Sequence, residues 1–261
     1  MSVRITSRQN PRVVALLRLR RLPPSESGCF FVEGEKLLGE ALRSTHRIRA
    51  LFVREGSEGV LPENLPPCER VTVSDGVMAR LSSLKSPSAV LAEGVIDRRL
   101  LLERPAPPGP WLALDGLQDP GNVGAIYRSA AAFSLPFLIL IPPAPDPFSE
   151  KVIRASAGAS LRVPTWRPAS VDALRAEADR AGLGIAVLHP RGETDLTALL
   201  AAERFLFVVG NEGHGVSEAI VSGASLRVRI PTSSCTESLN ASTAASLLLF
   251  TLDRGYRSGL S

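Results

Sequence analysis

Short apolar runs recur through the second half of the chain, and segments with the periodicity of helices lie between them. The runs are apolar on successive positions, which is typical of strands buried on both faces of a sheet. They predict strands over 111–114, 137–141, 185–188, 205–209 and 226–230. The segments between and after them predict helices over 123–133, 149–157, 171–181, 216–222 and 241–254. Strands that alternate with crossover helices predict an α/β domain with a parallel sheet.

The first half of the chain shows a similar alternation of shorter segments. It predicts helices over 11–21, 34–44 and 75–81, and strands over 30–33, 48–54 and 89–96. Between the halves, Glu103–Pro110 holds four prolines in eight residues, so neither a helix nor a central strand passes through it. We therefore predict a small α/β domain with a mixed sheet over residues 1–105 and a parallel-sheet domain over residues 111–261.

Composition and cysteine content exclude several classes of protein. With 44% hydrophobic and 21% charged residues, the 261-residue chain has enough apolar sequence for sizeable cores. Its longest apolar runs, such as Leu135–Ile141 and Ala244–Phe250, are far too short to cross a bilayer, and the N-terminus does not resemble a secretory signal. Cys29, Cys68 and Cys235 are too widely spaced for a disulfide framework or a zinc site. We expect a cytoplasmic protein with reduced thiols, no membrane segment and no metal.

Positive charge is concentrated in the first half of the chain. Residues 1–110 hold 17 Lys and Arg against 12 Asp and Glu, whereas residues 111–261 hold 13 against 14. The first 21 residues contain no acidic residue and six arginines: Arg4, Arg8, Arg12, Arg18, Arg20 and Arg21. Arginine forks suit phosphate groups, so this basic arm is either a contact for nucleic acid or an ordinary solvated surface.

Polar turns rich in small residues follow three of the predicted strands. In the first turn, Asn122 is positioned to cap a helix whose buried face holds Ile126, Ala130 and Phe133. Arg128 lies off that stripe, so it is either a surface side chain or one that projects toward the strand ends. Open α/β sheets bind ligands at the carboxyl ends of their strands, so the three turns predict one composite site.

The second turn, Gly210–Gly215, contains three glycines, and their bare backbone allows a ligand to come close. Its spacing fits neither the dinucleotide fingerprint nor the P-loop. Glu212 would repel phosphate and suits a ligand that carries hydroxyls, amines or positive charge. His214 has no Asp or Ser placed to complete a catalytic triad, so it is either a general base of another kind or an ordinary turn residue.

The third turn lies within Ile230–Ser242 and leads into a helix rich in Ala and Ser. Asn240 suits a simple N-cap of that helix. The loop, with Ser238 in it, also offers several backbone groups to a planar ligand such as adenine. The two interpretations are compatible with each other.

In this order, the three turns resemble motifs 1, 2 and 3 of the SpoU (TrmH) family of RNA ribose 2′-O-methyltransferases. The matching segments are Asn122–Ala130, Gly210–Gly213, Ile230–Pro231 and Ser238–Ser242. The resemblance covers about residues 111–256. Near the N-terminus, residues 7–11 (SRQNP) and 31–37 (FVEGEKL) resemble the small substrate-binding domain of the rRNA-directed branch, with a weaker match.

The resemblance implies an S-adenosylmethionine-dependent enzyme that methylates a ribose 2′-hydroxyl in RNA, with 23S rRNA as the expected target. It implies a C-terminal parallel-sheet SPOUT domain with a trefoil knot, a small α/β RNA-binding domain before it, and a homodimer whose partner subunit supplies some site residues. Carried over by position, it implies five residues of the catalytic group: Asn122, Arg128, Glu212, Ser238 and Asn240. It also implies three cofactor-binding residues: Gly210, Ile230 and Leu239.

The chain departs from the family at two positions of the third motif. The family usually has Met after the Ile-Pro pair and Gly two residues later, whereas this sequence has Thr232 and Ser234. Both positions lie in the loop that the resemblance assigns to the cofactor. The backbone of that loop is therefore where we expect this chain to differ most from its relatives.

Arg128 is the family's essential residue and is often proposed as its general base. A guanidinium keeps its proton throughout the accessible pH range, so we expect Arg128 instead to anchor the phosphate beside the target ribose and to stabilise developing oxyanion charge. Other functions remain open at this point. They are a tRNA ribose methyltransferase of the same family, an enzyme that modifies rRNA against an antibiotic, and a non-catalytic RNA-binding or ribosome-assembly protein that retains the fold.

Overall fold

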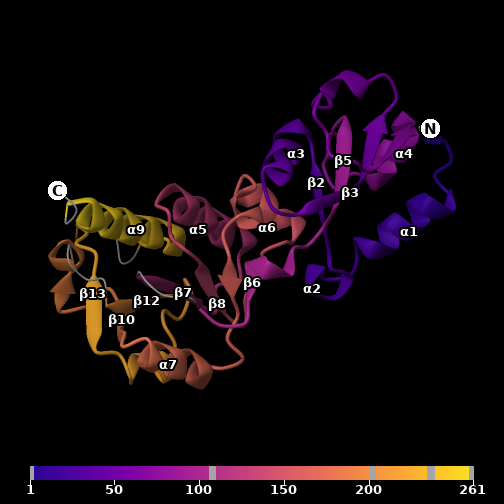
Figure 1. Cartoon of the computed structure of the whole chain (residues 1–261). Helices are drawn as coiled ribbons and strands as arrows, with labels where there is room; N and C mark the ends of the chain where they lie inside the picture. Colours follow the sequence, from indigo (N-terminus) through magenta and orange to yellow (C-terminus); the bar gives the residue numbers. More distant parts are fainter. Residues whose placement is uncertain (1–2, 106–109, 200–203, 234–238, 259–261) are drawn as a thin grey trace. The chain divides into compact units, whose positions relative to one another are not determined.

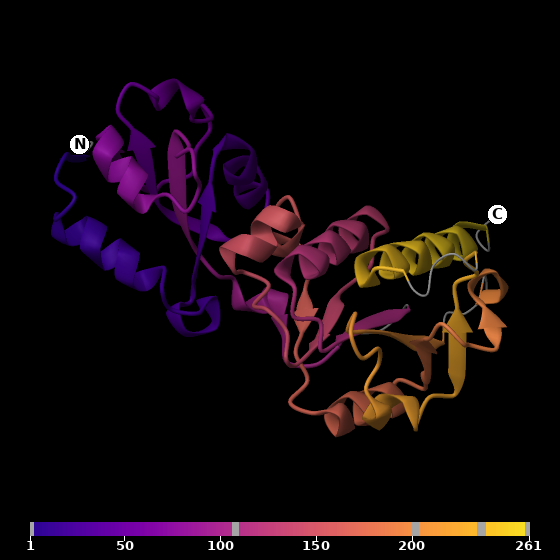
Figure 2. The same ribbon diagram turned by 180° about the vertical axis from the view of Figure 1, so that it is seen from behind.

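The computed structural model describes residues 3–105, 110–199, 204–233 and 239–258, the last four of these by their backbone alone. The chain divides into two compact units, which are coloured by sequence in Figures 1 and 2. Unit 1 comprises Met1–Asp97 and Asp146–Arg162, and unit 2 comprises Arg98–Pro145 and Val163–Ser261. The chain thus leaves unit 2 after Pro145 and returns to it at Val163. The sequence had predicted two consecutive domains divided between residues 105 and 111.

Unit 1 is built on a five-stranded sheet, and this sheet is mixed, as the sequence predicted. Its strands lie in the order β1-β4-β3-β5-β2. Their bounds are Val3–Ile5 (β1), Cys29–Glu33 (β2), Arg47–Arg54 (β3), Glu69–Val73 (β4) and Val90–Val95 (β5). β5 pairs antiparallel with β2 and β3, whereas β4 pairs parallel with β1 and β3. The sequence did not predict β1 or β4, because β1 has three residues and β4 begins with two exposed charged ones.

Short helices cover this sheet and contribute to its core. They are α1 (Pro11–Leu19), α2 (Pro24–Ser27), α3 (Glu35–Leu42), α4 (Asp75–Leu81) and α6 (Glu150–Ala155). The side chain of Asn10 caps α1 by accepting a hydrogen bond from the backbone N of Arg12 at 2.9 Å. Cys29 is buried in this unit and Cys68 is half-buried, and both are free thiols, while Cys235 lies outside the described residues.

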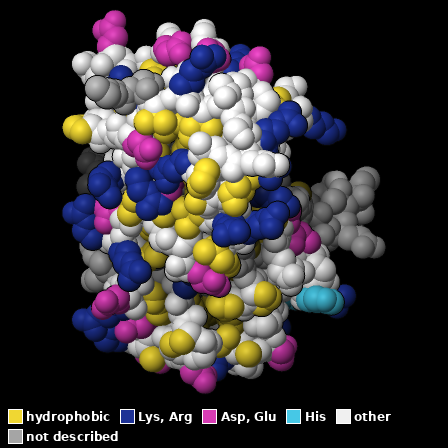
Figure 3. All heavy atoms as spheres, turned by 90° about the vertical axis from the view of Figure 1, so that its right-hand side faces the viewer, with side chains coloured by type: hydrophobic (Ala, Val, Ile, Leu, Met, Phe, Trp, Pro, Cys, Tyr) yellow, Lys and Arg dark blue, Asp and Glu magenta, His cyan; other side chains and the backbone are white. Residues whose placement is uncertain are grey.

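Most of the N-terminal arginines are tied to unit 1 and do not form a free arm. Four have partners: Arg4 with Glu55, Arg8 with the carbonyl of Gly76, Arg12 with Glu69 and Glu93, and Arg20 with Glu33 and Glu150. Arg18 and Arg21 are exposed, and their side chains have no hydrogen-bond or ion-pair partner among the described residues. The face of the molecule in Figure 3 shows Asp and Glu side chains between many of the Lys and Arg side chains.

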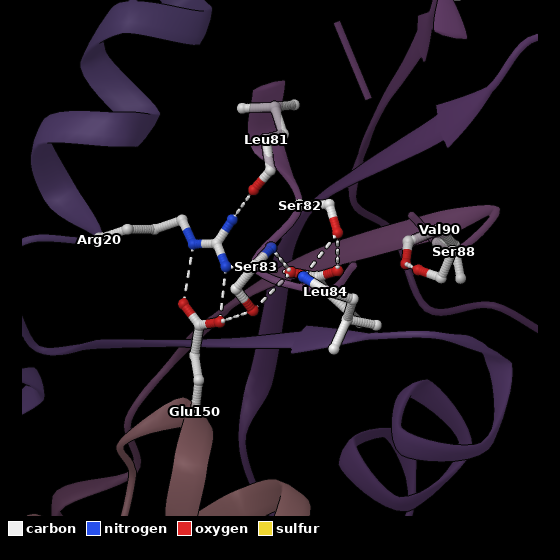
Figure 4. A network of polar contacts seen from close by, with 9 residues as sticks. Arg20, Leu81, Ser82, Ser83, Leu84, Ser88, Val90 and Glu150 are labelled. Carbon is white, nitrogen blue, oxygen red and sulfur yellow. Dashed lines mark hydrogen bonds and ion pairs between the residues drawn. The ribbon is translucent and has the colours of Figure 1, made fainter. Parts of the chain in front are cut away.

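A largely buried polar network holds α6 within unit 1 (Figure 4). Arg20 Nε donates to Glu150 Oε1 at 2.8 Å, and Arg20 Nη2 lies 3.1 Å from Glu33 Oε1. Glu33 also accepts from the backbone N of Ser83 at 2.6 Å and from the hydroxyl of Ser82 at 2.7 Å. Burial alone would raise the pKa of Glu33, but these hydrogen bonds and the charge of Arg20 lower it. The excursion of residues 146–162 into unit 1 is thus explained by contacts between residues far apart in the sequence.

Unit 2 contains an eight-stranded sheet in which all the described pairs are parallel. The strand order is β11-β13-β10-β12-β7-β8-β9-β6. The five strands that the sequence predicted are all present, each within one residue of its predicted ends: Trp111–Asp115 (β7), Leu138–Ile141 (β8), Gly184–Leu188 (β10), Phe205–Gly210 (β12) and Leu226–Arg229 (β13). The three unpredicted strands have two residues each, too few for a periodicity: Leu101–Leu102 (β6), Thr165–Trp166 (β9) and Thr194–Asp195 (β11).

Helices cover both faces of this sheet. Their bounds are Pro120–Ala132 (α5), Val171–Arg180 (α7), Glu218–Val221 (α8) and Ala241–Ser258 (α9). α5 and α9 lie side by side on one face, and α7 lies on the other (Figures 1 and 2). Trp111 and Trp166 are both buried in the core of this unit. Within the described part of the chain, no helix is long and apolar enough to cross a membrane.

Candidate active site

The turns that the sequence singled out begin at one edge of the unit 2 sheet. β7 and β12 are parallel neighbours, and their last residues, Asp115 and Gly210, pair with each other. The third turn follows β13, which is parallel to the β10 strand that separates it from β12, and β10 is parallel to β12 as well. The three strands therefore present their carboxyl ends together, at the position where open α/β sheets bind ligands.

The first turn differs from the prediction in how its helix begins. α5 begins at Pro120, and its N-cap is Asp119, whose side chain accepts from the backbone N of Asn122 at 2.9 Å. Proline suits the first helical position because no hydrogen-bond donor is required there. The prediction that Asn122 is the N-cap is therefore wrong. The correction matters because it leaves the Asn122 side chain available for other contacts.

Three predicted catalytic residues are joined by hydrogen bonds. Asn122 Nδ2 donates to Glu212 Oε1, and Asn240 Nδ2 donates to Asn122 Oδ1 at 3.1 Å. Asn240 Oδ1 accepts from the backbone N of Ser242 at 2.9 Å, so the residue also caps α9, as the sequence predicted. One residue from each of the three turns takes part, which confirms that the turns meet at one place.

The second turn is tightly closed on itself. A side chain at Gly210 would place its Cβ 2.1 Å from the backbone of Gly215, so only glycine fits there. The Asn211 amide donates to the carbonyl of Gly116 at 3.0 Å, and its oxygen accepts from the backbone N of Gly213 at 2.8 Å. These contacts hold the backbone on both sides of Glu212.

The sequence did not indicate two residues that position this turn. Asp115 is 7% exposed, and its carboxylate accepts from the backbone N of Ser217 at 2.7 Å, while Asn211 bonds as described above. An acidic residue at the end of a buried apolar strand was the available signal for Asp115. For Asn211 the signal was its place beside Glu212 in a glycine-rich turn.

Arg128 is placed differently from the joined residues. It lies on α5 and is exposed, and its side chain has no hydrogen-bond or ion-pair partner in the described part of the chain. The next residue, Ser129, bonds to Ser246 of α9 at 2.7 Å, which fixes the two helices together at this level. Ser238, the remaining predicted catalytic residue, lies outside the described residues.

A cavity of about 230 Å³ opens beside the joined residues. All three predicted cofactor residues line it: Gly210, Ile230 and Leu239. Thr232, one of the two departures from the family pattern, lines it as well. Most of the wall is apolar, and its polar side chains come from His189, Asn211, Glu212 and Thr232. Such a wall suits a small ligand with a flat apolar part and polar groups at its ends.

No metal-binding group is found at this site or elsewhere in the residues that the structure describes. None of their His, Cys, Asp and Glu side chains gather in threes or more where a metal ion could be held. The lining residues with polar side chains carry an amide, a carboxylate, an imidazole and a hydroxyl.

Two family profiles match this chain. The profile of the SpoU rRNA Methylase family matches residues 110–250, and that of the MRM3-like substrate binding domain matches residues 10–92. The 23S rRNA (guanosine(2553)-2′-O)-methyltransferase RlmP of Bacillus subtilis is 28% identical over 233 residues, which cover 87% of this chain and 90% of that protein. An uncharacterized tRNA/rRNA methyltransferase of Mycobacterium avium is 40% identical over 257 residues, which cover 90% and 82%.

A similar solved structure is the AdoMet-bound rRNA methyltransferase of Sinorhizobium meliloti. It has a TM-score of 0.82 and 27% sequence identity to this chain. The match covers 99% of this chain and 98% of that one, so it includes both units.

Proposed function

The chain belongs to the SpoU rRNA methylase family, and from that membership we propose that it is an S-adenosylmethionine-dependent enzyme that methylates a ribose 2′-hydroxyl in RNA. The observation that carries the proposal is the joining of Asn122, Glu212 and Asn240 beside a cavity lined by all three predicted cofactor residues. A decayed site in a non-catalytic RNA-binding protein would be expected to lose some of these residues.

The chemistry of the cavity fits the proposed cofactor. The half-buried lining residues Leu188, Ile230 and Leu239 offer an apolar surface to adenine, and the carboxylate of Glu212 suits hydroxyl groups or the positive sulfonium. When bound, S-adenosylmethionine supplies the electrophilic methyl group. The similar structure from Sinorhizobium meliloti was solved with AdoMet bound, which supports the same cofactor for this chain.

Within the site, the amide network holds Glu212 in place. Asn122 binds one oxygen of the Glu212 carboxylate, and Asn240 fixes the orientation of the Asn122 amide. These residues orient the target ribose against the methyl donor. Alignment of reacting groups alone lowers the activation barrier by roughly 7–11 kcal/mol in the best intramolecular cases. Ser238 completes the pocket in this proposal.

Arg128 anchors the phosphate beside the target ribose and stabilises the charge that develops on the 2′-oxygen. Its exposure and its lack of a partner among the described residues leave the guanidinium available for RNA. The proton leaves to a neighbouring phosphate or to water, because guanidinium does not act as a base at accessible pH.

The enzyme acts as a homodimer with a trefoil knot in unit 2, as the family resemblance implies. Leu247 and Phe250 on α9 are 39% and 45% exposed, and Phe250 packs edge-on against Phe133 at the end of α5. Exposed apolar side chains on a helix suit an interface between two copies of the chain. Arg128 lies on α5, the helix that Phe133 caps, and in this proposal it completes the site of the partner subunit.

The RNA is 23S rRNA in this proposal, and the enzyme is cytoplasmic. A separate unit that matches a substrate-binding domain favours a folded rRNA target over a tRNA loop, and RlmP of Bacillus subtilis is a 23S rRNA methyltransferase. The second candidate is a tRNA ribose methyltransferase, since the relative from Mycobacterium avium is named for both RNAs. Protection against an antibiotic would follow from the rRNA activity and is not a separate chemistry.

Ribose-methylation mapping distinguishes these candidates. rRNA and tRNA are compared between a strain from which the gene is deleted and the same strain with the gene restored. We expect one 2′-O-methylated nucleotide in 23S rRNA to disappear and return. A tRNA site that behaves in this way supports the second candidate, and an unchanged methylation pattern in both RNAs contradicts the proposed function.

A further inference from the structure

We propose that His189 is a positioning residue for the cofactor, donating a hydrogen bond from its Nε2–H to an oxygen of bound S-adenosylmethionine. This inference rests on the proposed function, because it concerns the same cavity. His189 follows β10 directly, and neither the motif pattern nor the family resemblance drew attention to it. Its ring is one of the polar groups in an otherwise mostly apolar wall.

The proton position on the His189 ring follows from its contacts. The backbone N of Arg191 donates to His189 Nδ1 at 3.1 Å. A nitrogen that accepts a hydrogen bond carries no proton in the neutral ring, so the proton of the neutral imidazole is on Nε2. No described residue accepts a hydrogen bond from that nitrogen, so it is available to a ligand.

The backbone around His189 is held firmly against β13. The backbone N of His189 donates to the carbonyl of Val228 at 2.8 Å, and the backbone N of Gly192 donates to the carbonyl of His189 at 3.0 Å. A side chain at Gly192 would place its Cβ 2.6 Å from the backbone of Val228, so this turn approaches β13 as closely as only glycine permits. The imidazole is therefore positioned before any ligand arrives.

The same turn continues into an edge strand that fastens it further. Thr194 of β11 pairs with Val228 of β13, and the carboxylate of Asp195 forms an ion pair with Arg229. β13 leads directly to Ile230 and Thr232, which also line the cavity. The turn after β10 and the cofactor loop after β13 thus form two walls of one cavity, and β13 connects them.

The other polar side chains of the wall are less suited to bind a ligand oxygen. The Asn211 side chain is engaged at both ends by the protein, and the Glu212 carboxylate only accepts hydrogen bonds. Thr232 offers a hydroxyl, but it is exposed, and no described residue holds that hydroxyl by a hydrogen bond. Among the described lining side chains, His189 is the donor that is both held in place and unused. Ribose hydroxyls and the methionine carboxylate are the acceptors that the cofactor carries.

Calorimetric titration with S-adenosylhomocysteine tests the proposal without requiring turnover. We expect His189→Leu to weaken binding about tenfold, the value of one net hydrogen bond. His189→Gln keeps an N–H donor and should stay within about threefold of the wild type. Arg191→Leu is the matched control, because this exposed side chain lies in the same turn but does not line the cavity. Thermal unfolding without ligand checks that each variant is folded.

The choice of ligand locates the accepting oxygen. If the ribose accepts the bond, His189→Leu weakens adenosine and S-adenosylhomocysteine by the same factor. If the carboxylate accepts it, only S-adenosylhomocysteine is weakened. Either result supports the proposal.

Nuclear magnetic resonance supplies an independent readout. The chain has three histidines, so their imidazole signals are readily assigned, and His46 in unit 1 is an internal control. We expect S-adenosylhomocysteine to shift the Nε2 signal of His189 and to leave that of His46 unchanged.

Failure of the role of His189 can be distinguished from failure of the proposed function. Equal binding by wild type and His189→Leu, or equal loss in His189→Gln and His189→Leu, overturns the role of His189 and leaves the proposed function standing. A wild-type dimer that does not bind S-adenosylhomocysteine contradicts the proposed function itself.

Discussion

Two polar networks in this molecule, one in each unit, lie in very different surroundings. In unit 1, Arg20 and Glu33 have side chains that are only 8% and 4% exposed, and Glu150 completes the network at 24%. In unit 2, Asn122 is half-buried, and Glu212 and Asn240 are exposed, at the carboxyl edge of the sheet. One network is enclosed by the protein, and the other opens onto a cavity.

The difference in charge between the networks is as informative as the difference in burial. Burial alone would lower the pKa of Arg20, but its bonds to Glu150 and Glu33 raise it above the usual value, so each charge has its counter-charge. Glu212 is bound by a neutral amide and has no ion-pair partner among the described residues. A closed, compensated network indicates structure, whereas an open network with uncompensated charge indicates binding or catalysis.

Breaking the closed network should have the largest effect. We expect Arg20→Ala to destabilise unit 1 by about 3–5 kcal/mol, because it leaves Glu33 buried without its counter-charge. Hydrogen exchange of β2 and β5 measures this loss. Trp111 and Trp166 are both in unit 2, so intrinsic fluorescence reports whether unit 2 is unaffected.

Arg18→Ala is the control for this substitution, because Arg18 is on the same helix but exposed. Its effect should be below about 0.5 kcal/mol. If Arg20→Ala lowered the stability of unit 1 by less than about 1 kcal/mol, the network would not be what holds residues 146–162 in unit 1.

Removing the exposed arginine of unit 2 should have the opposite profile. We expect Arg128→Ala to lower the rate of methyl transfer about 10²–10³-fold, as loss of an oxyanion-stabilising donor does, and to change stability by less than about 0.5 kcal/mol. Single-turnover methylation and thermal unfolding measure the two quantities. Arg128→Lys should also lose most activity if the guanidinium binds phosphate with both arms. Wild-type turnover in Arg128→Ala is incompatible with the proposed role.

Acid should destabilise unit 1 through His46. His46 is buried between Phe30 and Phe148, and burial lowers its pKa from 6.5 to about 4. The unfolded chain binds a proton here below pH 6.5 and the folded chain only below about 4, so unit 1 loses stability as the pH falls through that window. The loss is at most about 3 kcal/mol, from 1.36 kcal/mol for each pKa unit.

Hydrogen exchange of β2 and β3 between pH 6.5 and 4 tests this prediction. The free energy of opening of the wild type is compared with that of His46→Gln, which keeps an acceptor for the backbone N of Asp97. The variant should show a flatter dependence on pH in this window. The same slope in both proteins would mean that other groups cause the acid sensitivity.

The smallest effect should come from separating the two roles of Asn240. Asn240→Asp keeps the N-cap of α9, so stability should change by only a few tenths of a kcal/mol, while Asn240→Ala should cost about 1 kcal/mol. Both variants lose the donor to Asn122 Oδ1, and we expect both to lose activity. Thermal unfolding and methylation rates measure the pair. Full activity in Asn240→Asp would show that the amide bond to Asn122 is dispensable.

The parts of the fold that depend on local patterns could be predicted from the sequence. The apolar runs of β7 and β12 and the helix α4 correspond closely to their predicted ranges, because burial on both faces and helical periodicity act over a few residues. The excursion of residues 146–162 into unit 1 could not be predicted, because it depends on Arg20, Glu33 and Glu150, which are far apart in the sequence.

The site, too, has parts that could be predicted from the sequence and parts that could not. Its three turns could be predicted because each follows a strand whose carboxyl end is where ligands bind. The cap of α5 was predicted at Asn122, although Asp119 followed by Pro120 is itself a helix-start signal. The partners of the N-terminal arginines and the place of His189 in the cavity wall come from tertiary packing, which no local pattern carries.

The most direct test of the account is to identify the methylated nucleoside. Wild-type enzyme and the Arg128→Ala variant are each incubated with methyl-labelled S-adenosylmethionine and unmodified 23S rRNA, and the RNA is digested to nucleosides for mass spectrometry. The account predicts label in a single 2′-O-methylnucleoside with the wild type and at least 10²-fold less with the variant. Label on a base, or none from the wild type with either rRNA or tRNA, would contradict it.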